Sequence, residues 1–220
     1  MPVELSWKTD PVVQLEAAIL PVLSLAPDIL CRLAMAADHP PDVAQLLDAL
    51  SVFDTAEKQL REGGAQFLEP TGISLDAEAM GICRDAADIL AQAQRELSGA
   101  ITSYSNHKTN LNGSGARMAD LISRDLRSSV NAAIDAFRRV FIGTVLKRHA
   151  AQARQAQTAV TQLAEISETI FFIGINASVE AARVGEAGLG FSVISEDIRY
   201  LAANARSSTA SLRAVLDGSA

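Results

Sequence analysis

Aromatic side chains are scarce in this chain. One Trp, two Tyr and seven Phe make up 5% of its 220 residues, whereas apolar residues as a whole make up 49%. Sheets depend on aromatic and β-branched side chains, so this balance favours helices and still supplies enough apolar surface for a buried core. Charged residues reach 20%, a mixture typical of a globular chain rather than a disordered one.

An excess of positive charge and a set of metal ligands are also missing. Acidic residues outnumber basic ones by 26 to 19, which gives a net charge of −7 and excludes the basic footprint of a nucleic-acid binder. The two cysteines and three histidines lack metal-ligand spacing, so we expect reduced, partly buried thiols and neither metal nor cofactor. These residues are Cys31, Cys83, His39, His107 and His149.

A long uninterrupted apolar run is absent as well. The most apolar stretch, residues 12–37, is interrupted by Glu16, Asp28, Arg32 and two prolines, whereas a spanning helix needs about 20 nearly continuous apolar residues. The first ten residues lack the basic and apolar regions of a secretory signal. We therefore expect no membrane span and a soluble, cytoplasmic protein.

Helical spacing dominates what is present. A compact helical bundle is predicted over residues 1–150, as a candidate input or oligomerisation domain, with a separate domain at 151–220. The chain contains no proline after Pro70, so nothing forces the last helix of the bundle to stop before Gly185. The predicted segments are a helix over 11–37 that is kinked at Pro21 or broken near Pro27, a helix from Asp42 to Gly63–Gly64, a loop over 64–74, a helix from Ser74 or Asp76 to about Ser105, a connector over 105–115 and a helix from Ala116.

Two heptad-spaced arms flank a glycine-containing turn at the C-terminal end. Residues along each arm alternate in steps of three and four, and helices joined by so short a connection pack antiparallel. The fold class is therefore all-α, with an antiparallel coiled-coil hairpin after the long helix. Because two helices leave much of this heptad seam wet, a second copy is expected to complete a four-helix bundle. The heptad seam consists of Leu163, Ile166, Ile170, Ile173, Ala177, Glu180 and Val184 in the first arm, and Phe191, Ile194, Ile198, Leu201, Ala205, Ser208, Leu212 and Val215 in the second.

The first arm carries two features that a purely apolar seam does not explain. Glu180 places a carboxylate in an otherwise apolar layer, where Arg183, three residues later, can pair with it. Apolar residues beside the seam widen the apolar surface and indicate a protein interface, although the N-terminal bundle is an alternative cover for them. They are Phe171, Phe172, Ile175 and Val179.

Residues 176–191, NASVEAARVGEAGLGF, resemble the hairpin tip of methyl-accepting chemotaxis proteins, whose pattern reads NAAIEAARAGEQGRGF. Residues 192–202, SVISEDIRYLA, are similar to the family's AVVAEEVRKLA. The resemblance covers roughly residues 160–216. It implies a cytoplasmic signalling tip that dimerises into a four-helix bundle, associates further through the tip, and binds a chemotaxis histidine kinase and its coupling adaptor.

The resemblance also implies roles for particular residues. Contacts between dimers fall on Phe172, Asn176, Glu180 and Arg183, beside Phe171. The surface for kinase and adaptor falls on Ile175, Asn176, Val179 and Val193, with Glu186 at the turn and Gly185, Gly188 and Gly190 forming it. The chain departs from the family pattern at Thr169, Phe171 and Leu189, which replace Gln, Asn and Arg and make the tip more apolar.

The leading hypothesis is a soluble, minimal receptor-like protein whose hairpin engages or tunes a kinase array. The short arms have no counterpart of the family's distant methylation sites on the second arm, so we expect no methylation-based adaptation. The alternative is a helical assembly protein that uses the hairpin only for self-association. An enzyme is not expected, because no catalytic ordering is present and the glycine-rich residues 185–190 follow a helix rather than a strand.

Overall fold

The computed structural model describes residues 10–107 and 115–218. The chain divides into two compact units, Met1–Thr144 and Val145–Ala220. Throughout the described ranges the regular structure is helical, with no strand, which confirms the all-α fold class. The N-terminal residues 1–9 and most of the expected connector, residues 108–114, lie outside the described residues.

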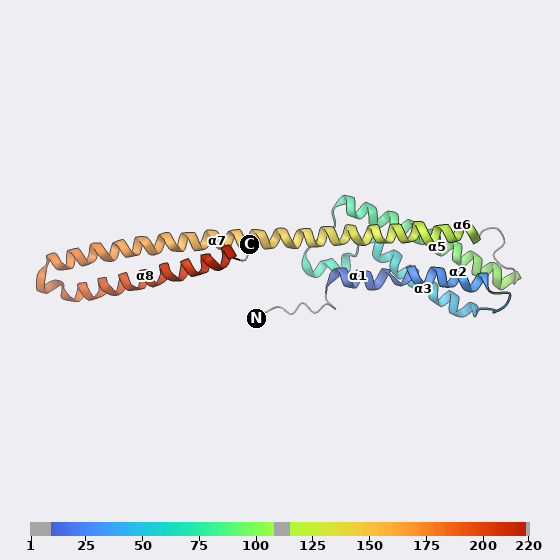
Figure 1. Cartoon of the computed structure of the whole chain (residues 1–220), viewed down its shortest axis with the longest axis horizontal. Helices are drawn as coiled ribbons and strands as arrows, with labels where there is room; N and C mark the ends of the chain where they lie inside the picture. Colours follow the sequence, from blue (N-terminus) through green and yellow to red (C-terminus); the bar gives the residue numbers. More distant parts are fainter. Residues whose placement is uncertain (1–9, 108–114, 219–220) are drawn as a thin grey trace. The chain divides into compact units, whose positions relative to one another are not determined.

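Figure 1 labels the principal helices in chain order. The described elements are α1 (Pro11–Ile19), α2 (Pro21–Ala34), α3 (Val43–Arg61), α4 (Ala65–Leu68), the 3-10 turn η2 (Glu69–Thr71), α5 (Ala77–His107), α6 (Gly115–Asp120), the π-helical turn η3 (Leu121–Leu126), α7 (Arg127–Arg183), the 3-10 turn η4 (Gly185–Gly188) and α8 (Leu189–Gly218).

Aspartate side chains cap the helices at the starts that the sequence predicts. Each carboxylate accepts a hydrogen bond from a backbone N–H in the first turn, where the helix itself supplies no partner. The pairs are Asp10 with Val12 at 2.8 Å, Asp42 with Ala44 at 2.9 Å and Asp76 with Ala79 at 2.8 Å.

The first predicted helix is interrupted at Leu20, directly before Pro21, as the first of the two alternatives expected. Two local predictions are corrected. A break near Pro27 is wrong, because Pro27 lies inside α2, which ends at Ala34 rather than at residue 37. Packing of the buried face of α2 outweighs the backbone hydrogen bond that Pro27 cannot donate. Residues 64–74 are not wholly a loop, because α4 and η2 form within them.

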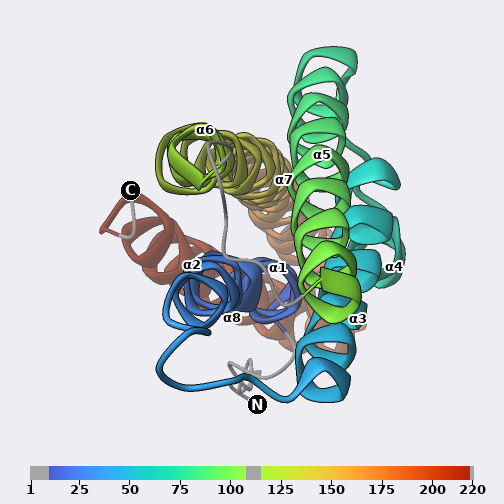
Figure 2. The ribbon, with the colours of Figure 1, turned by 90° about the vertical axis from the view of Figure 1, so that its right-hand side faces the viewer.

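The first unit consists of two crossing layers of helices. Figure 2 shows α2 and α6 nearly end-on, while α3 and α5 run side by side across the view. Polar contacts fix α3 and α5 as an antiparallel pair: Gln94 donates to Asp54 at 2.7 Å, and Arg61 bonds Asp88 at 2.9 Å. Arg61 also bonds Glu57, and these two hydrogen bonds raise the pKa of its guanidinium.

The core of this unit lies between the two layers. Its largest fully buried side chains come from every long helix of the unit and include Leu15, Ile29, Phe53, Leu90 and Phe137. The α3 helix ends where predicted, because Gly63 and Gly64 adopt φ of 61° and 63°, which glycine tolerates best. A Cβ on Gly64 would lie 2.7 Å from the ring of Phe137, so this glycine also admits the core aromatic. The π-helical turn η3 was not predicted.

One helical stretch among the described residues, Pro11–Ala34, is long and apolar enough to cross a membrane by length and composition. Core helices of soluble proteins meet the same criteria. Leu15, Ile19, Val22 and Ile29 along this stretch are at most 1% exposed within the bundle. A location in the cytoplasm therefore stays a prediction.

The long helix α7 continues as the sequence predicts. It runs from Arg127 through Gly143 and Gly174 and ends at Arg183, just before the first glycine of the turn. In the second unit, η4 reverses the chain and α8 returns alongside α7 (Figure 1).

Candidate functional site

The two arms of the hairpin meet along small residues rather than along the heptad seam. Buried positions recur every seventh residue on both helices. From position 167 onward, each directly follows a seam residue, as Ser167 follows Ile166 and Ser195 follows Ile194. At Gly174 a Cβ would lie 2.7 Å from Cγ of Arg199 and 3.3 Å from the carbonyl oxygen of Ser195. This small-residue stripe consists of Val160, Ser167, Gly174 and Ala181 on α7 and Ser195, Ala202 and Thr209 on α8.

The hydroxyl groups of the small-residue stripe are satisfied within their own helices. Ser167 donates to the carbonyl oxygen of Leu163 at 2.7 Å, and Ser195 donates to that of Phe191 at 2.7 Å. Thr209 bonds a carbonyl one turn earlier in the same way. Polar side chains therefore lie between the arms without unpaired groups, and their small size lets the backbones approach closely.

The heptad seam itself lies mostly open, as expected for a two-helix hairpin. Ten of its large apolar side chains are at least 40% exposed. An apolar face of this length is typical of a protein–protein interface. The ten residues are Leu163, Ile166, Ile170, Ile173 and Val184 on α7 and Phe191, Ile194, Leu201, Leu212 and Val215 on α8.

The turn depends on two of its glycines. Gly185 adopts φ of 65°, which other residues rarely adopt. Gly188 packs on the backbone of Ala181, and a Cβ there would overlap the Ala181 carbonyl group. Gly190, which the sequence analysis placed in the turn, lies in the first turn of α8 with open space around it. Glu186 lies in η4 and is exposed.

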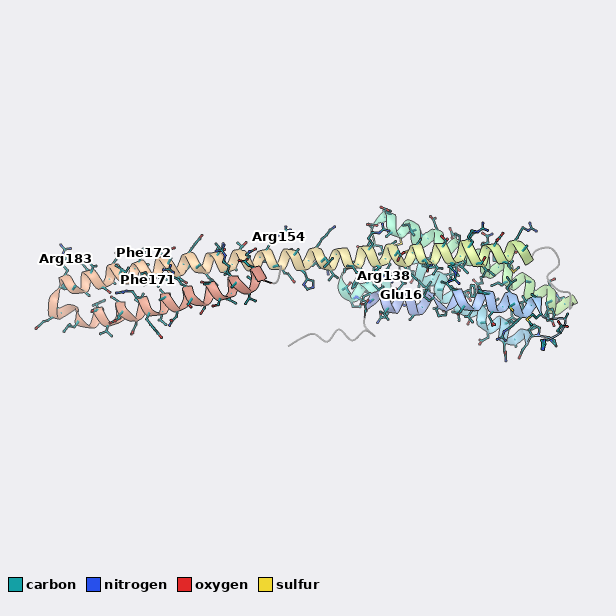
Figure 3. All side chains as sticks on the ribbon, in the orientation of Figure 1. Glu16, Arg138, Arg154, Phe171, Phe172 and Arg183 are labelled. Atoms are coloured by element: carbon teal, nitrogen blue, oxygen red, sulfur yellow. The ribbon has the colours of Figure 1, made fainter. Side chains whose placement is uncertain are left out.

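The tip, meaning residues 171–193, presents the half-buried Phe171 and two exposed phenylalanines, Phe172 and Phe191. The rings of Phe171 and Phe172 stand edge to face with centroids 6.3 Å apart. Arg199 of α8 lies over the Phe171 ring at 5.7 Å, a cation–π contact that joins the arms. Phe172 is 54% exposed, and Figure 3 labels both rings along α7.

The remaining tip residues named from the sequence are mostly exposed. Val179 and Val193 are more than 60% exposed, Asn176 is exposed and Ile175 is half-buried. Apolar and amide groups are thus available to a partner on both arms.

Glu180 and Arg183 form an ion pair at 3.8 Å near the turn, where Figure 3 shows Arg183. Both side chains are more than two-thirds exposed, so the pair contributes little to the stability of the hairpin. Its charges are free to meet complementary charges on a partner, where they contribute to specificity.

No group of three or more His, Cys, Asp or Glu residues is placed to hold a metal ion within the described ranges. His39 follows α2, His107 ends α5 and His149 lies in α7.

The prediction of partly buried thiols is wrong for Cys31. This residue is exposed, because Ile29 and Leu33 occupy the core-facing side of α2. Cys83 is buried, and this burial raises the pKa of its thiol to about 11.

The second unit is thus an antiparallel helical hairpin with an open apolar seam and an exposed tip. The sequence of residues 142–218 matches the profile of the methyl-accepting chemotaxis protein (MCP) signalling domain. The resemblance to the signalling domain of methyl-accepting chemotaxis proteins that was stated from the sequence is confirmed.

The chain is similar in sequence to curated methyl-accepting chemotaxis proteins. Over 183 residues, or 76% of this chain, the identity to the methyl-accepting chemotaxis protein NahY of Pseudomonas putida is 26%, and the match covers 33% of that protein. Over 72 residues, or 33% of this chain, the identity to McpN of Pseudomonas aeruginosa is 35%, covering 13% of it. Over 58 residues, or 26% of this chain, the identity to McpC of Bacillus subtilis is 40%, covering 9% of it. The chain therefore spans a third or less of each relative, and no solved structure matches it significantly.

The small-residue stripe is the feature that sequence reasoning missed. Its signal was present, because Ser, Gly, Ala and Thr recur at intervals of seven beside the apolar seam. The residues of this face share small side chains rather than apolar ones, so a search for apolar periodicity does not detect it.

Proposed function

We propose that this protein is a cytoplasmic, chemoreceptor-like signal transducer whose hairpin tip binds a chemotaxis histidine kinase and its coupling adaptor. The observation that supports this most strongly is the match of residues 142–218 to a chemoreceptor signalling domain, together with exposed tip residues at the matching positions. In this proposal the chain transmits a signal and catalyses no reaction itself.

Self-association follows from the open heptad seam. Covering the exposed half of a large apolar side chain stabilises by roughly 1 kcal/mol. Ten such residues on each of two copies give on the order of 20 kcal/mol, against an association cost of about 4–15 kcal/mol. A second copy of this chain, packed seam to seam, would form a four-helix bundle.

The tip would then make two kinds of contact, one to a neighbouring dimer and one to the kinase and the adaptor. Phe172, Asn176, Glu180 and Arg183 would face a neighbouring dimer, where an exposed ring supplies apolar area and the ion pair sets the register. The contacts to the kinase and the adaptor would fall on Ile175, Asn176, Val179 and Val193.

The helical bundle of the first unit would supply the input or set the oligomeric state. A ligand or a partner that favours one packing of the bundle would shift a helix equilibrium that continues into α7. The continuity of α7 from Arg127 to Arg183 supports this route, because no break separates the bundle from the hairpin along that helix.

The second candidate is an assembly protein that uses the hairpin only for self-association, which the open seam favours equally. Co-purification of the full chain with the host's chemotaxis kinase and adaptor separates the two. We expect capture by the wild type, at least a tenfold loss in Phe172→Ala and Glu180→Ala, and full capture by Glu165→Ala. The control removes the same charge from an exposed position on α7 away from the turn.

Dimerisation without any kinase or adaptor in the wild-type eluate would overturn the signalling proposal and leave the assembly function. Equal capture by wild type, Phe172→Ala and Glu180→Ala would place the contact outside the tip.

A further inference from the structure

Three residues with soft or borderline donor atoms lie where α2 ends. Cys31, Met35 and His39 line one cavity of about 300 Å³. The Sγ atom of Cys31 lies 3.8 Å from the Sδ atom of Met35. All three residues are exposed, so an ion from solvent has access to the sulfurs and the imidazole.

The backbone holds these residues in register. They follow one another at intervals of four along α2 and its C-terminal turn, which places successive side chains on neighbouring positions of one face. The N–H group of His39 donates to the carbonyl oxygen of Met35 at 3.0 Å, so the chain is still wound where the imidazole begins. Pro40 follows directly and restricts the backbone of His39.

The charged neighbours in the cavity have other partners. Arg32 pairs with Asp28 at 2.8 Å. The Asp42 carboxylate accepts a hydrogen bond from Ala44 at the start of α3. A thiol, a thioether and an imidazole are the soft and borderline donors of this cavity.

We propose that Cys31, Met35 and His39 form a binding site for a monovalent copper ion, Cu(I). Thiolate and thioether sulfurs select Cu(I), whereas carboxylates and water suit harder ions. With metal–sulfur bonds of about 2.3 Å, a separation of 3.8 Å between the sulfurs corresponds to an S–Cu–S angle of roughly 110°. The imidazole supplies a third donor. Binding replaces the thiol proton of Cys31, which leaves to solvent, and changes no oxidation state.

This site lies in the first unit and goes beyond the proposed function, because neither the match to the signalling domain nor the tip enters the argument. It gives the bundle a ligand of defined chemistry. The alternative is that the sulfur contact is simple packing between neighbouring side chains.

Competition with a chromogenic Cu(I) chelator tests the site in the full chain, under anaerobic, reducing conditions. We expect one Cu(I) per wild-type chain and at least about tenfold weaker binding in both Cys31→Ser and Met35→Leu, since even outer-shell changes around metal ligands cost 10–100-fold. Met35→Leu keeps the size of an exposed side chain while removing the thioether. Cys83→Ala is the matched control, because that thiol is buried.

X-ray absorption on the copper-loaded chain supplies an independent readout, with two sulfur neighbours and one nitrogen neighbour expected in the wild type. Loss of the nitrogen neighbour in His39→Gln completes the assignment. The proposal is overturned if the chelator removes all copper from the wild type, if Cys31→Ser or Met35→Leu binds as tightly as the wild type, or if Cys83→Ala alone abolishes binding.

Discussion

Gly188 lies against the backbone of Ala181, so closely that a Cβ atom at position 188 would lie 2.0 Å from the Ala181 carbonyl oxygen. This contact closes the hairpin, because it lets the end of η4 pack on the last turns of α7. The family resemblance places a glycine here, and the structure supplies the steric reason for it.

Gly188→Ala is therefore expected to open the turn. A methyl group cannot occupy space already held by backbone, so α8 must shift away from α7 and lose contacts along the small-residue stripe. We expect a lower melting temperature by circular dichroism and faster proteolysis of residues 189–218.

Gly190→Ala is the control for this prediction. It lies two residues further on, inside α8, with nothing near its Cβ position, so better helix propensity should stabilise it by up to about 1 kcal/mol. Equal melting temperatures for the two variants would contradict the role given to Gly188.

Alanine substitutions at Phe171 and Phe172 are expected to distinguish the stability of the hairpin from its binding to a partner. Phe171 is half-buried under Arg199, so Phe171→Ala removes packing between the arms and should lower the free energy of unfolding by about 1–2 kcal/mol. Phe172 is largely exposed, and Phe172→Ala should change stability by less than about 0.5 kcal/mol. Urea unfolding followed by circular dichroism compares the two. A larger loss for Phe172→Ala would mean that the arms pack differently in solution.

The pH dependence of stability should report the burial of Cys83. Burial raises the pKa of this thiol from 9.0 to about 11. Below pH 9 the buried thiol makes its full contribution to the free energy of unfolding. Between the two values the unfolded chain releases the proton and the folded chain keeps it, so the free energy of unfolding falls as the pH rises.

The size of this loss is at most about 3 kcal/mol, reached near pH 11. Subtracting the profile of Cys83→Ala from that of the wild type isolates it from other titrating groups. Cys31→Ala, which alters the exposed thiol, should retain the wild-type profile. Parallel curves for the wild type and Cys83→Ala between pH 9 and 11 would contradict the burial of this thiol.

The open heptad seam leads to a prediction about oligomeric state. Leu201 lies on the seam and Tyr200 lies beside it, and the two side chains are similarly exposed at 64% and 68%. Leu201→Asp would bury a carboxylate between two copies and should shift a dimer to monomer, whereas Tyr200→Asp should leave it dimeric. Sedimentation velocity at several concentrations distinguishes them. A wild type that is monomeric at all concentrations would show that the seam is not self-complementary.

The sequence predicted the features that local chemistry controls. Asp10, Asp42 and Asp76 begin helices because their carboxylates satisfy free N–H groups, and the run without proline carries α7 to its end at Arg183. The heptad seam likewise follows from apolar spacing alone.

Features set by packing between elements were not predictable in the same way. The seam pattern does not say whether its residues meet within one chain or between two, and in this chain the small-residue stripe takes the contact between the arms. The exposure of Cys31 depends on which face of α2 packs in the bundle. Phe171 was placed on the partner surface, whereas its contact with Arg199 appears only once the arms are brought together.

Site-specific photo-crosslinking from position 172 tests the central claim most directly. A photoreactive phenylalanine analogue replaces Phe172 in the full chain, and the same analogue at the exposed Gln152, far along α7 from the turn, serves as the control. With the host's purified kinase and adaptor present, we predict adducts to one or both from position 172 and none from position 152. Adducts from position 152 alone, or none from position 172 while the chain is folded and dimeric, would contradict a docking surface at the tip.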